Sequence, residues 1–272
     1  MSNVTQEHIV ELLNGFEAHG LDDLDKASLM NRVDTKFLVP IDKLPQVFES
    51  IRSHYSVLEI DGKRCFRYQS TYFDTDDFLF YYKHHSGRLN RHKVRTRRYV
   101  DSDLSFLEVK FKNNKKRTIK KRVKLADDGS IRLKDHDAFL DATGLPQEVI
   151  LKPRLKNSYS RIAFASEERG ERLTIDMGLE NQAILRDGDA RSKLENVAIV
   201  ELKQARVDRE SPFFAVVRAL GIRPSSFSKY CMGIMMSAES SGSTSLKTNR
   251  FKRILRRVGR LSSDKQLEKE TG

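Results

Sequence analysis

The sequence of 272 residues has little of what marks secreted, membrane-spanning or metal-binding proteins. Its two cysteines, Cys65 and Cys231, form neither a metal-ligand spacing nor a disulfide framework, so we expect reduced thiols. The N-terminus lacks the basic and apolar regions of a signal peptide. No apolar run approaches the ~20 residues that span a bilayer. These absences predict a cytoplasmic protein.

Several catalytic signatures are also missing from the chain. It contains no Gly-rich phosphate loop, no nucleophile elbow and no metalloprotease helix. The seven histidines are scattered, and His84 and His85 beside Arg88 and Arg91 fit a polar turn better than a metal site. If the chain handles phosphate, it must therefore do so with side chains and not with backbone amides at a helix N-terminus.

Positive charge is what the chain has in excess. The formal net charge is +12, which indicates an anionic partner or surface. The charge is dense at 83–98 and 110–124, and densest at 247–260, which holds no acid. The basic residues of this last stretch are Lys247, Arg250, Lys252, Arg253, Arg256, Arg257 and Arg260. Residues 237–245 before it read as a flexible linker by composition.

The spacing of apolar residues predicts a mainly antiparallel sheet with flanking helices. Strands are expected at residues 32–40, 64–73, 92–100, 105–112, 118–125, 158–165, 171–177, 181–185 and 197–203. Helices are expected at residues 7–16, 41–51, 77–85, 135–143, 147–155, 211–220 and 226–236. No break rich in Pro or Gly interrupts the alternating segments, so we expect one domain at 1–236 with its core at about 30–233, then the linker at 237–245 and a basic amphipathic tail at 246–272.

Charged residues two apart in these strands must share a face of the sheet. Arg95 and Arg97 are joined in this way by Lys93, and paired guanidinium groups hold phosphate oxygens by forked hydrogen bonds. A strand face in solvent is an equally simple explanation, although solvent faces usually mix charges of both signs. The charged faces therefore lie in solvent or line the lumen of a closed sheet.

Lysine follows glutamate by two residues in two strands, at Glu108 and Lys110 and again at Glu201 and Lys203. Each pair is either a same-face salt bridge or a functional pair, in which the lysine holds a phosphate and the glutamate a divalent cation. The functional interpretation is favoured more for Glu201, because it lies in the apolar run 198–202, where a carboxylate without a partner would be costly.

In this order, the motifs resemble the vacuolar transporter chaperone (VTC) polyphosphate polymerase domain, within the CYTH or triphosphate tunnel metalloenzyme superfamily. The resemblance runs from about residue 32 to residue 233. The matching pieces are RVDTKF at 32–37, STYFDT at 70–75, KVRTR at 93–97, LEVK at 107–110, SYSRIAF at 158–164, RLTID at 172–176, VELK at 200–203 and SKY at 228–230.

The resemblance implies an α+β fold in which an antiparallel β-barrel, the triphosphate tunnel, is flanked by helices. It implies Mn²⁺ or Mg²⁺ as cofactor, with Glu201 as metal carboxylate. The superfamily's opening Glu-x-Glu-x-Lys reads Arg32-Val33-Asp34-Thr35-Lys36 here, which leaves Asp34 and Glu108 as further metal candidates. The implied phosphate ligands are Lys36, Arg95, Arg97, Lys110, Arg161 and Lys229, with Lys93 and Lys203 as supporting cations.

The implied activity is transfer of the terminal phosphoryl group of ATP, or of another triphosphate, to a growing polyphosphate chain. A triphosphatase or nucleotidyl cyclase in the same tunnel is an alternative, and a noncatalytic polyphosphate-binding or polyanion-binding module is another. Nucleic acid is disfavoured as a partner, because the strands show no clear stacking aromatics or groove-reading helix. For the basic tail we expect an anionic membrane surface or an acidic partner, which would place the protein at the inner membrane surface.

Overall fold

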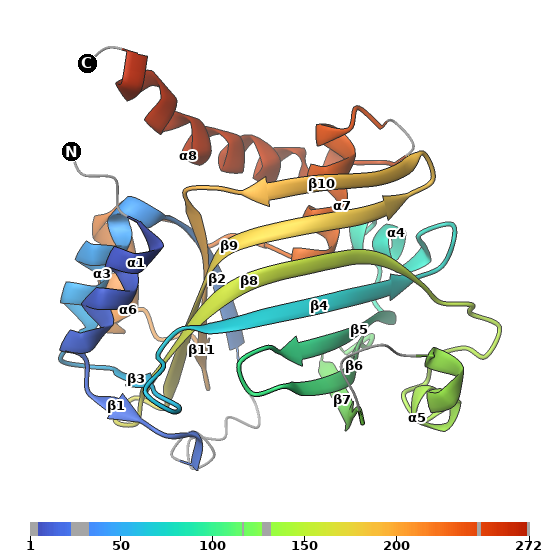
Figure 1. The fold of residues 1–272 in the computed structure, drawn as a ribbon, viewed down its shortest axis with the longest axis horizontal. Coiled ribbons are helices and arrows are strands. Elements are labelled where there is room, and N and C mark those ends of the chain that lie inside the picture. Colours follow the sequence, from blue (N-terminus) through green and yellow to red (C-terminus); the bar gives the residue numbers. More distant parts are fainter. Residues whose placement is uncertain (1–4, 23–32, 116, 127–131, 244–245, 271–272) are drawn as a thin grey trace.

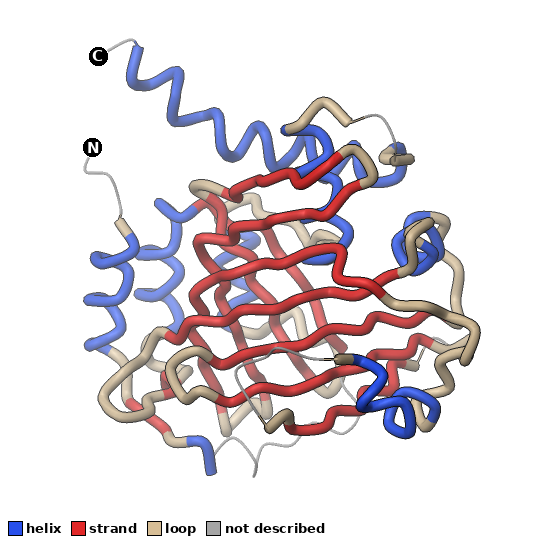
Figure 2. Tube along the Cα trace, turned by 45° about the vertical axis from the view of Figure 1, so that its right-hand side comes forward, coloured by secondary structure: helices blue, strands red, loops and turns tan. Residues whose placement is uncertain are grey.

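A computed structural model describes residues 5–22, 33–115, 117–126, 132–243 and 246–270, with side chains up to residue 261. It contains one sheet of mixed strand lengths with helices around it (Figures 1 and 2). The strands are β1 (Ala18–His19), β2 (Val33–Pro40), β3 (Ser56–Leu58), β4 (Phe66–Asp74), β5 (Arg91–Tyr99), β6 (Leu104–Lys112), β7 (Thr118–Lys124), β8 (Lys152–Ser166), β9 (Glu171–Leu185), β10 (Gly188–Leu194) and β11 (Val197–Gln204). The α-helices are α1 (Gln6–Glu11), α3 (Leu44–Ile51), α4 (Leu79–His85), α5 (Asp137–Asp141), α6 (Pro212–Ala219), α7 (Lys229–Ser240) and α8 (Lys252–Glu270).

The sheet is antiparallel along the order β2-β11-β9-β8-β4-β5-β6-β7. Strand β10 pairs with β9, β3 pairs with β8, and the short β1 runs parallel to β3. The predicted antiparallel sheet with flanking helices is confirmed. The sheet curls like a tunnel, but its end strands β2 and β7 are not paired with each other in the described part of the chain, so hydrogen bonds do not close a barrel.

The two longest strands, β8 and β9, bend the sheet. Gly178 lies in the middle of β9 with a φ of 61°, a backbone conformation that residues with a Cβ adopt at a cost. Next to it, the register between β8 and β9 shifts between Ser158 and Ser160. Such irregularities increase local twist and curvature. On the edge of β9 opposite β8, residues 172–176 pair with β11 and residues 179–185 pair with β10, both antiparallel.

Apolar packing fixes the outer face of the sheet, which we define as the face that carries Phe37 of β2. Helices α1, α3 and α6 pack there on the apolar residues of β2, β11, β9 and β8. Phe37 itself contacts Phe213 and Phe214 of α6, with ring centroids 5.3 and 5.5 Å apart. Because side chains alternate along a strand, Lys36 and Leu38 face the opposite, inner side.

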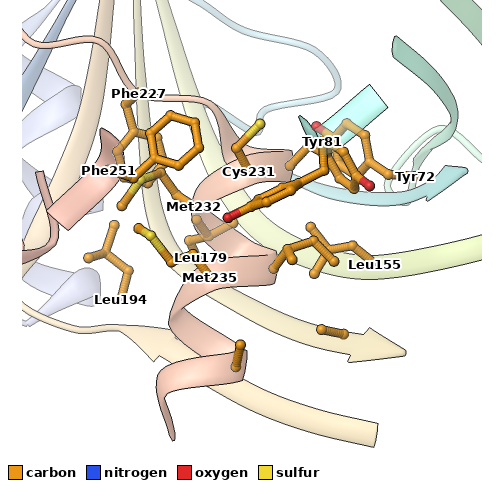
Figure 3. Close-up of a cluster of buried hydrophobic side chains, with 14 of the residues drawn as sticks. Tyr72, Tyr81, Leu155, Leu179, Leu194, Phe227, Cys231, Met232, Met235 and Phe251 are labelled. Carbon is orange, nitrogen blue, oxygen red and sulfur yellow. The ribbon is translucent and has the colours of Figure 1, made fainter. Parts of the chain in front are cut away.

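Helix α7 fills part of the inner face with apolar side chains. Cys231, Met232 and Met235 are fully buried against residues such as Leu155 of β8 and Leu179 of β9 (Figure 3). Gly233 is where the helix approaches closest, since a Cβ there would lie 2.7 Å from Cδ2 of Leu155. The apolar filling leaves the charged residues of the inner face together at the N-terminal end of α7.

Several predicted elements differ from the structure. The helix predicted at 147–155 is wrong, because β8 begins at Lys152 and pairs with β4. The two strands predicted at 171–177 and 181–185 are one strand, since Gly178 bends β9 without ending it. Strand β10 was not predicted, because its sequence GDARSKL is too polar to show alternation. The linker predicted at 237–245 starts too early, because α7 continues to Ser240 and Ser237 is fully buried.

The basic tail is docked on the domain. Helix α8 has a basic and an apolar side, but Phe251 and Val258 are 6% and 5% exposed and belong to the same apolar cluster as α7. Ile254 and Leu255 pack against that cluster as well. This side is therefore covered by protein and not presented to a membrane. None of the described helices combines the length and apolar character that a bilayer crossing requires.

Candidate active site

The strand register brings the predicted site residues to one face of the sheet. Residues directly opposite each other in an antiparallel pair point to the same side. The opposite pairs are Lys36 with Glu201, Asp34 with Lys203, Arg95 with Glu108, Lys93 with Lys110, and Arg161 with Asp176. Lys229 joins them from the first turn of α7. Alternation predicts which cations share a face within one strand, and the strand register brings the cations of several strands to the same side of the sheet.

Glu201 lies between two lysines. Its Oε1 is 3.4 Å from Nζ of Lys36 and 3.4 Å from Nζ of Lys203. Burial alone would raise the pKa of its carboxyl, but Lys203 and Lys36, with smaller contributions from Arg161 and Lys110, hold that pKa well below its usual range. Arg161 belongs to β8 and Lys110 to β6, so cations of two further strands act on Glu201.

Asp176 of β9 is an acidic residue of the site that was not predicted from the sequence. Its oxygens accept hydrogen bonds from Nε and Nη2 of Arg161 at 2.5 and 2.8 Å, and it contacts Nζ of Lys229. Burial opposes its ionisation, but the two cations keep the pKa of Asp176 well below its usual range. The alternation of segment 172–176 put Asp176 on a charged face, but nothing in the sequence indicated that two of the predicted phosphate ligands would meet there.

Glu108, a further metal candidate of the sequence, lies between two cations. Its Oε2 accepts hydrogen bonds from Nη2 and Nε of Arg95 at 2.5 and 2.8 Å, and its Oε1 lies 2.5 Å from Nζ of Lys120. Although burial opposes ionisation, Arg95, Arg97 and Lys120 keep the pKa of Glu108 well below its usual range. Lys120 was not predicted, because β7 reads as an exposed basic strand. Both oxygens of Glu108 therefore contact cations, and its role toward a metal stays a prediction.

Three other cations of the inner face have no such partner. Lys93, Arg97 and Lys110 form no ion pair within 4 Å of a carboxylate among the described residues. Lys93 donates to Oγ of Ser228 at 2.9 Å, and Arg97 donates to the hydroxyl of Tyr159 at 3.0 Å. Burial and the neighbouring Arg95 lower the pKa of Lys110 to about 7, and burial lowers the pKa of Lys93. Buried cations without counter-charge are costly unless an anion joins them.

Tyrosine rings hold the arginines in place. The guanidinium carbon of Arg161 lies 5.0 Å from the ring centroid of Tyr68, and that of Arg97 lies 5.4 Å from the same ring. The hydroxyl of Tyr72 accepts a hydrogen bond from Nη1 of Arg95 at 3.1 Å. Cation–π contact and a hydrogen bond fix guanidinium orientation without neutralising the charge. No site role was predicted from the sequence for Tyr68, Tyr72 or Tyr159.

The donor set for a divalent cation is small. The described residues contain no group of three or more His, Cys, Asp or Glu side chains that could hold a metal ion. Glu201 is the carboxylate with the loosest contacts, since its two lysines are 3.4 Å away whereas Glu108 and Asp176 accept hydrogen bonds of 2.5 Å. Mg²⁺ commonly binds through one or two carboxylates together with substrate phosphates. The residues therefore fit a cation that arrives with a phosphate ligand, with Glu201 as its carboxylate.

Comparison of the chain with known proteins gives one family and several distant structures. A family model described as VTC domain matches residues 31–238. No significant match was found among curated proteins. The “putative adenylate cyclase” of Vibrio parahaemolyticus is 12% identical, with 75% of this chain and 99% of that chain covered and a TM-score of 0.43.

Two further structures are similar to the same extent. A “putative adenylyl cyclase” from Hippeastrum, described as having a dominant triphosphatase activity, is 12% identical over 74% of this chain and 93% of its own, with a TM-score of 0.43. A protein from Pyrococcus horikoshii is 15% identical over 75% and 97%, with a TM-score of 0.40. Similarities of this size carry no functional argument. The family match, in contrast, covers most of the chain and agrees with the motifs, and the chain belongs to the VTC domain family.

Proposed function

We propose that the chain is an ATP-dependent polyphosphate polymerase. A phosphate chain would lie along the inner face, and the terminal phosphoryl group of ATP would be transferred to the end of that chain. In this transfer the bond between the γ-phosphorus and the bridging oxygen breaks, a chain oxygen forms the new bond, and ADP leaves. The coarser conclusion, an enzyme that binds triphosphates, agrees with the VTC domain match and requires fewer assumptions.

The observation that carries the proposal is the surplus of cations on the inner face, where Arg97 is buried and Lys93 and Lys110 are half-buried. Lys93, Arg97 and Lys110 lie on one face and form no ion pair with a carboxylate of the described residues. Beside them, Lys36 shares Glu201 with Lys203, and Arg95 shares Glu108 with Lys120. Burial and the neighbouring Arg95 lower the pKa of Lys110, so its charged form is disfavoured there without a bound anion. A linear anion with several charges offsets this cost along its length, whereas a single carboxylate ligand does not.

The residues of the site would act by position and charge. Lys36, Arg97, Lys110 and Arg161 would hold phosphate oxygens, while Glu108 and Asp176 keep Arg95 and Lys229 oriented. Phosphoryl transfer needs little covalent chemistry from a protein, so placing donor and acceptor in line and neutralising charge supply most of the effect. A divalent cation bound at Glu201, with Asp34 on the neighbouring strand, would neutralise charge on the transferred group.

The decisive experiment is a product analysis. Purified protein is incubated with ATP and Mn²⁺, and the products are separated on a polyacrylamide gel while free phosphate is assayed in parallel. The proposal predicts a ladder of polyphosphate and one ADP for each phosphate added. Free phosphate without a ladder would replace the polymerase with a triphosphatase, and a cyclic nucleotide would replace it with a cyclase. The absence of any turnover would leave a binding module.

A further inference from the structure

The beginning of the basic tail lies against helix α4. The main-chain oxygen of Lys247 accepts a hydrogen bond from the hydroxyl of Tyr81 at 2.9 Å. The Phe251 ring lies 5.4 Å from the His85 ring and 5.9 Å from the His84 ring. These contacts lie just before the start of α8, the red C-terminal helix of Figure 1, which then packs against β2 and β11.

Arg250, from the turn just before α8, meets the turn after α4 at this point. The backbone N of Arg250 donates to Nε2 of His85 at 3.3 Å. The guanidinium of Arg250 lies close over Gly87, where a Cβ would be 2.9 Å from its Cζ, and Gly87 has a φ of 70°, which favours glycine. In the same turn, Nη1 of Arg91 donates to the main-chain oxygen of Arg88 at 2.7 Å.

The same place is connected to the inner face by a short series of contacts. Nζ of Lys93 donates to Oγ of Ser228, which also accepts a hydrogen bond from the backbone N of Cys231 at 3.3 Å. The Cys231 Sγ lies 3.1 Å from Nδ1 of His84. Burial, and then the charges of Lys93, Arg91 and Arg250, lower the pKa of His84 to about 2. His84 thus lies near both Lys93 of the inner face and Arg250 of the basic tail.

We define the cationic strip as Arg88, Arg91, Arg250, Lys252, Arg253 and Arg256. None of the six forms an ion pair with a carboxylate in the part of the chain that the structure describes. Lys252, Arg253 and Arg256 are exposed, and positions 252 and 256 are one helical turn apart, as are 253 and 256. Like charges held in a row repel one another, which a polyanion would relieve.

We propose that the cationic strip is a binding track for polyphosphate, continuing the inner face from Lys93 to the surface of α8. The inference rests on the proposed function, because it assigns to that site a path for chains too long to lie inside. A membrane is the less suitable partner, since Phe251 and Val258 are buried in the domain and α8 has no free apolar side in its described part to insert.

The test is a binding measurement on the full chain, without turnover. The triple variant Lys252→Gln, Arg253→Gln, Arg256→Gln removes exposed charge and keeps Phe251 and Val258. A matched control, Lys156→Gln, Arg186→Gln, Arg191→Gln, removes as many exposed charges from β8, from the end of β9 and from β10. Inorganic triphosphate and polyphosphate of about 60 phosphates are titrated into both. We expect the α8 variant to lose roughly tenfold in affinity for the long chain and to keep triphosphate affinity.

Each other outcome overturns the proposal in a distinguishable way. Unchanged long-chain affinity in the α8 variant, or an equal loss in the control, would remove the track while leaving triphosphate binding in place. Loss of triphosphate affinity as well would make α8 part of the inner site. A wild-type protein that binds neither ligand would overturn the proposed function together with the track. Anionic lipid vesicles whose binding, unlike that of polyphosphate, depends on the three residues would assign the strip to a membrane.

Discussion

At the scale of single residues, Lys110 is the group whose charge is most sensitive to a ligand. Its pKa of about 7 lies below the ordinary lysine value of about 10.4 because of burial and the neighbouring Arg95. A bound triphosphate stabilises the ammonium form and raises that pKa. Binding above pH 7 is therefore accompanied by proton uptake, and the contribution of Lys110 to affinity falls as the pH rises from about 7 to about 10.

Lys110→Arg keeps the positive charge at every pH in that window, because guanidinium does not lose its proton in proteins. We expect the variant to bind triphosphate with a flatter pH profile than the wild type. Calorimetry in two buffers with different ionisation enthalpies measures the proton uptake directly. The ligand ionises in the same way in the titrations of the wild type and of Lys110→Arg. Identical pH profiles of the two proteins would therefore show that Lys110 does not contact the ligand.

Glu201 separates metal binding from phosphate binding. Glu201→Gln keeps the side-chain volume and removes the charge between Lys36 and Lys203, so triphosphate affinity without metal should be kept or increased. The Mn²⁺ requirement should rise, and turnover should fall by roughly a hundredfold or more. ATP turnover is measured across a Mn²⁺ series.

The matched control for this measurement is Glu180→Gln. Glu180 is an exposed carboxylate of β9 that also pairs with a lysine, Lys193, at 3.4 Å. It should leave both metal dependence and turnover unchanged. Near-normal turnover of Glu201→Gln at the wild-type Mn²⁺ concentration would remove Glu201 from the mechanism and make Asp34 the carboxylate to test.

At the scale of elements, α7 joins the apolar packing to the site, because it buries Met232 and Met235 and begins with Lys229. Gly233→Ala would place a Cβ 2.6 Å from Oδ1 of Asn181 and 2.7 Å from Cδ2 of Leu155. We expect the free energy of unfolding to fall by about 1–3 kcal/mol, since the buried Leu155 must move. Urea denaturation measures the change.

Gly259→Ala in α8 is the control for helix propensity. A Cβ at Gly259 meets no atom within 4 Å, so this variant should be as stable as the wild type or more stable by up to ~1 kcal/mol. If α7 also positions Lys229, triphosphate affinity should fall in Gly233→Ala but not in Gly259→Ala. Equal stability of the two variants would contradict the close approach of α7 to the sheet.

The elements also show which parts of the account sequence reasoning could reach. Alternation predicts that Arg95 and Arg97 share a face, because the side-chain period of a strand is local. It does not predict that Asp176 meets both Arg161 and Lys229, because the second contact depends on where α7 packs. Nor does it tell an apolar side covered by protein from one that faces a membrane, because the burial of Phe251 depends on where α8 docks on the domain.

At the scale of the whole molecule, the curled sheet serves as a frame with apolar packing on its outer face and cations on its inner face. Helices α1, α3 and α6 cover one side of the outer face, while α7 and α8 fill part of the inner face. The space that remains for charged residues is therefore confined to one region. Because the cations of β5, β6 and β11 are confined together, they repel one another, and this repulsion favours the binding of a linear polyanion.

The central claim is that this inner face holds a phosphate chain, and a crystal structure of the protein with inorganic triphosphate and Mn²⁺ tests it most directly. We predict phosphate oxygens within hydrogen-bond distance of Lys36, Arg97 and Lys110, with the cation between the phosphates and Glu201. Triphosphate bound only on the outer face or only along α8, with the inner face unchanged, would contradict the account.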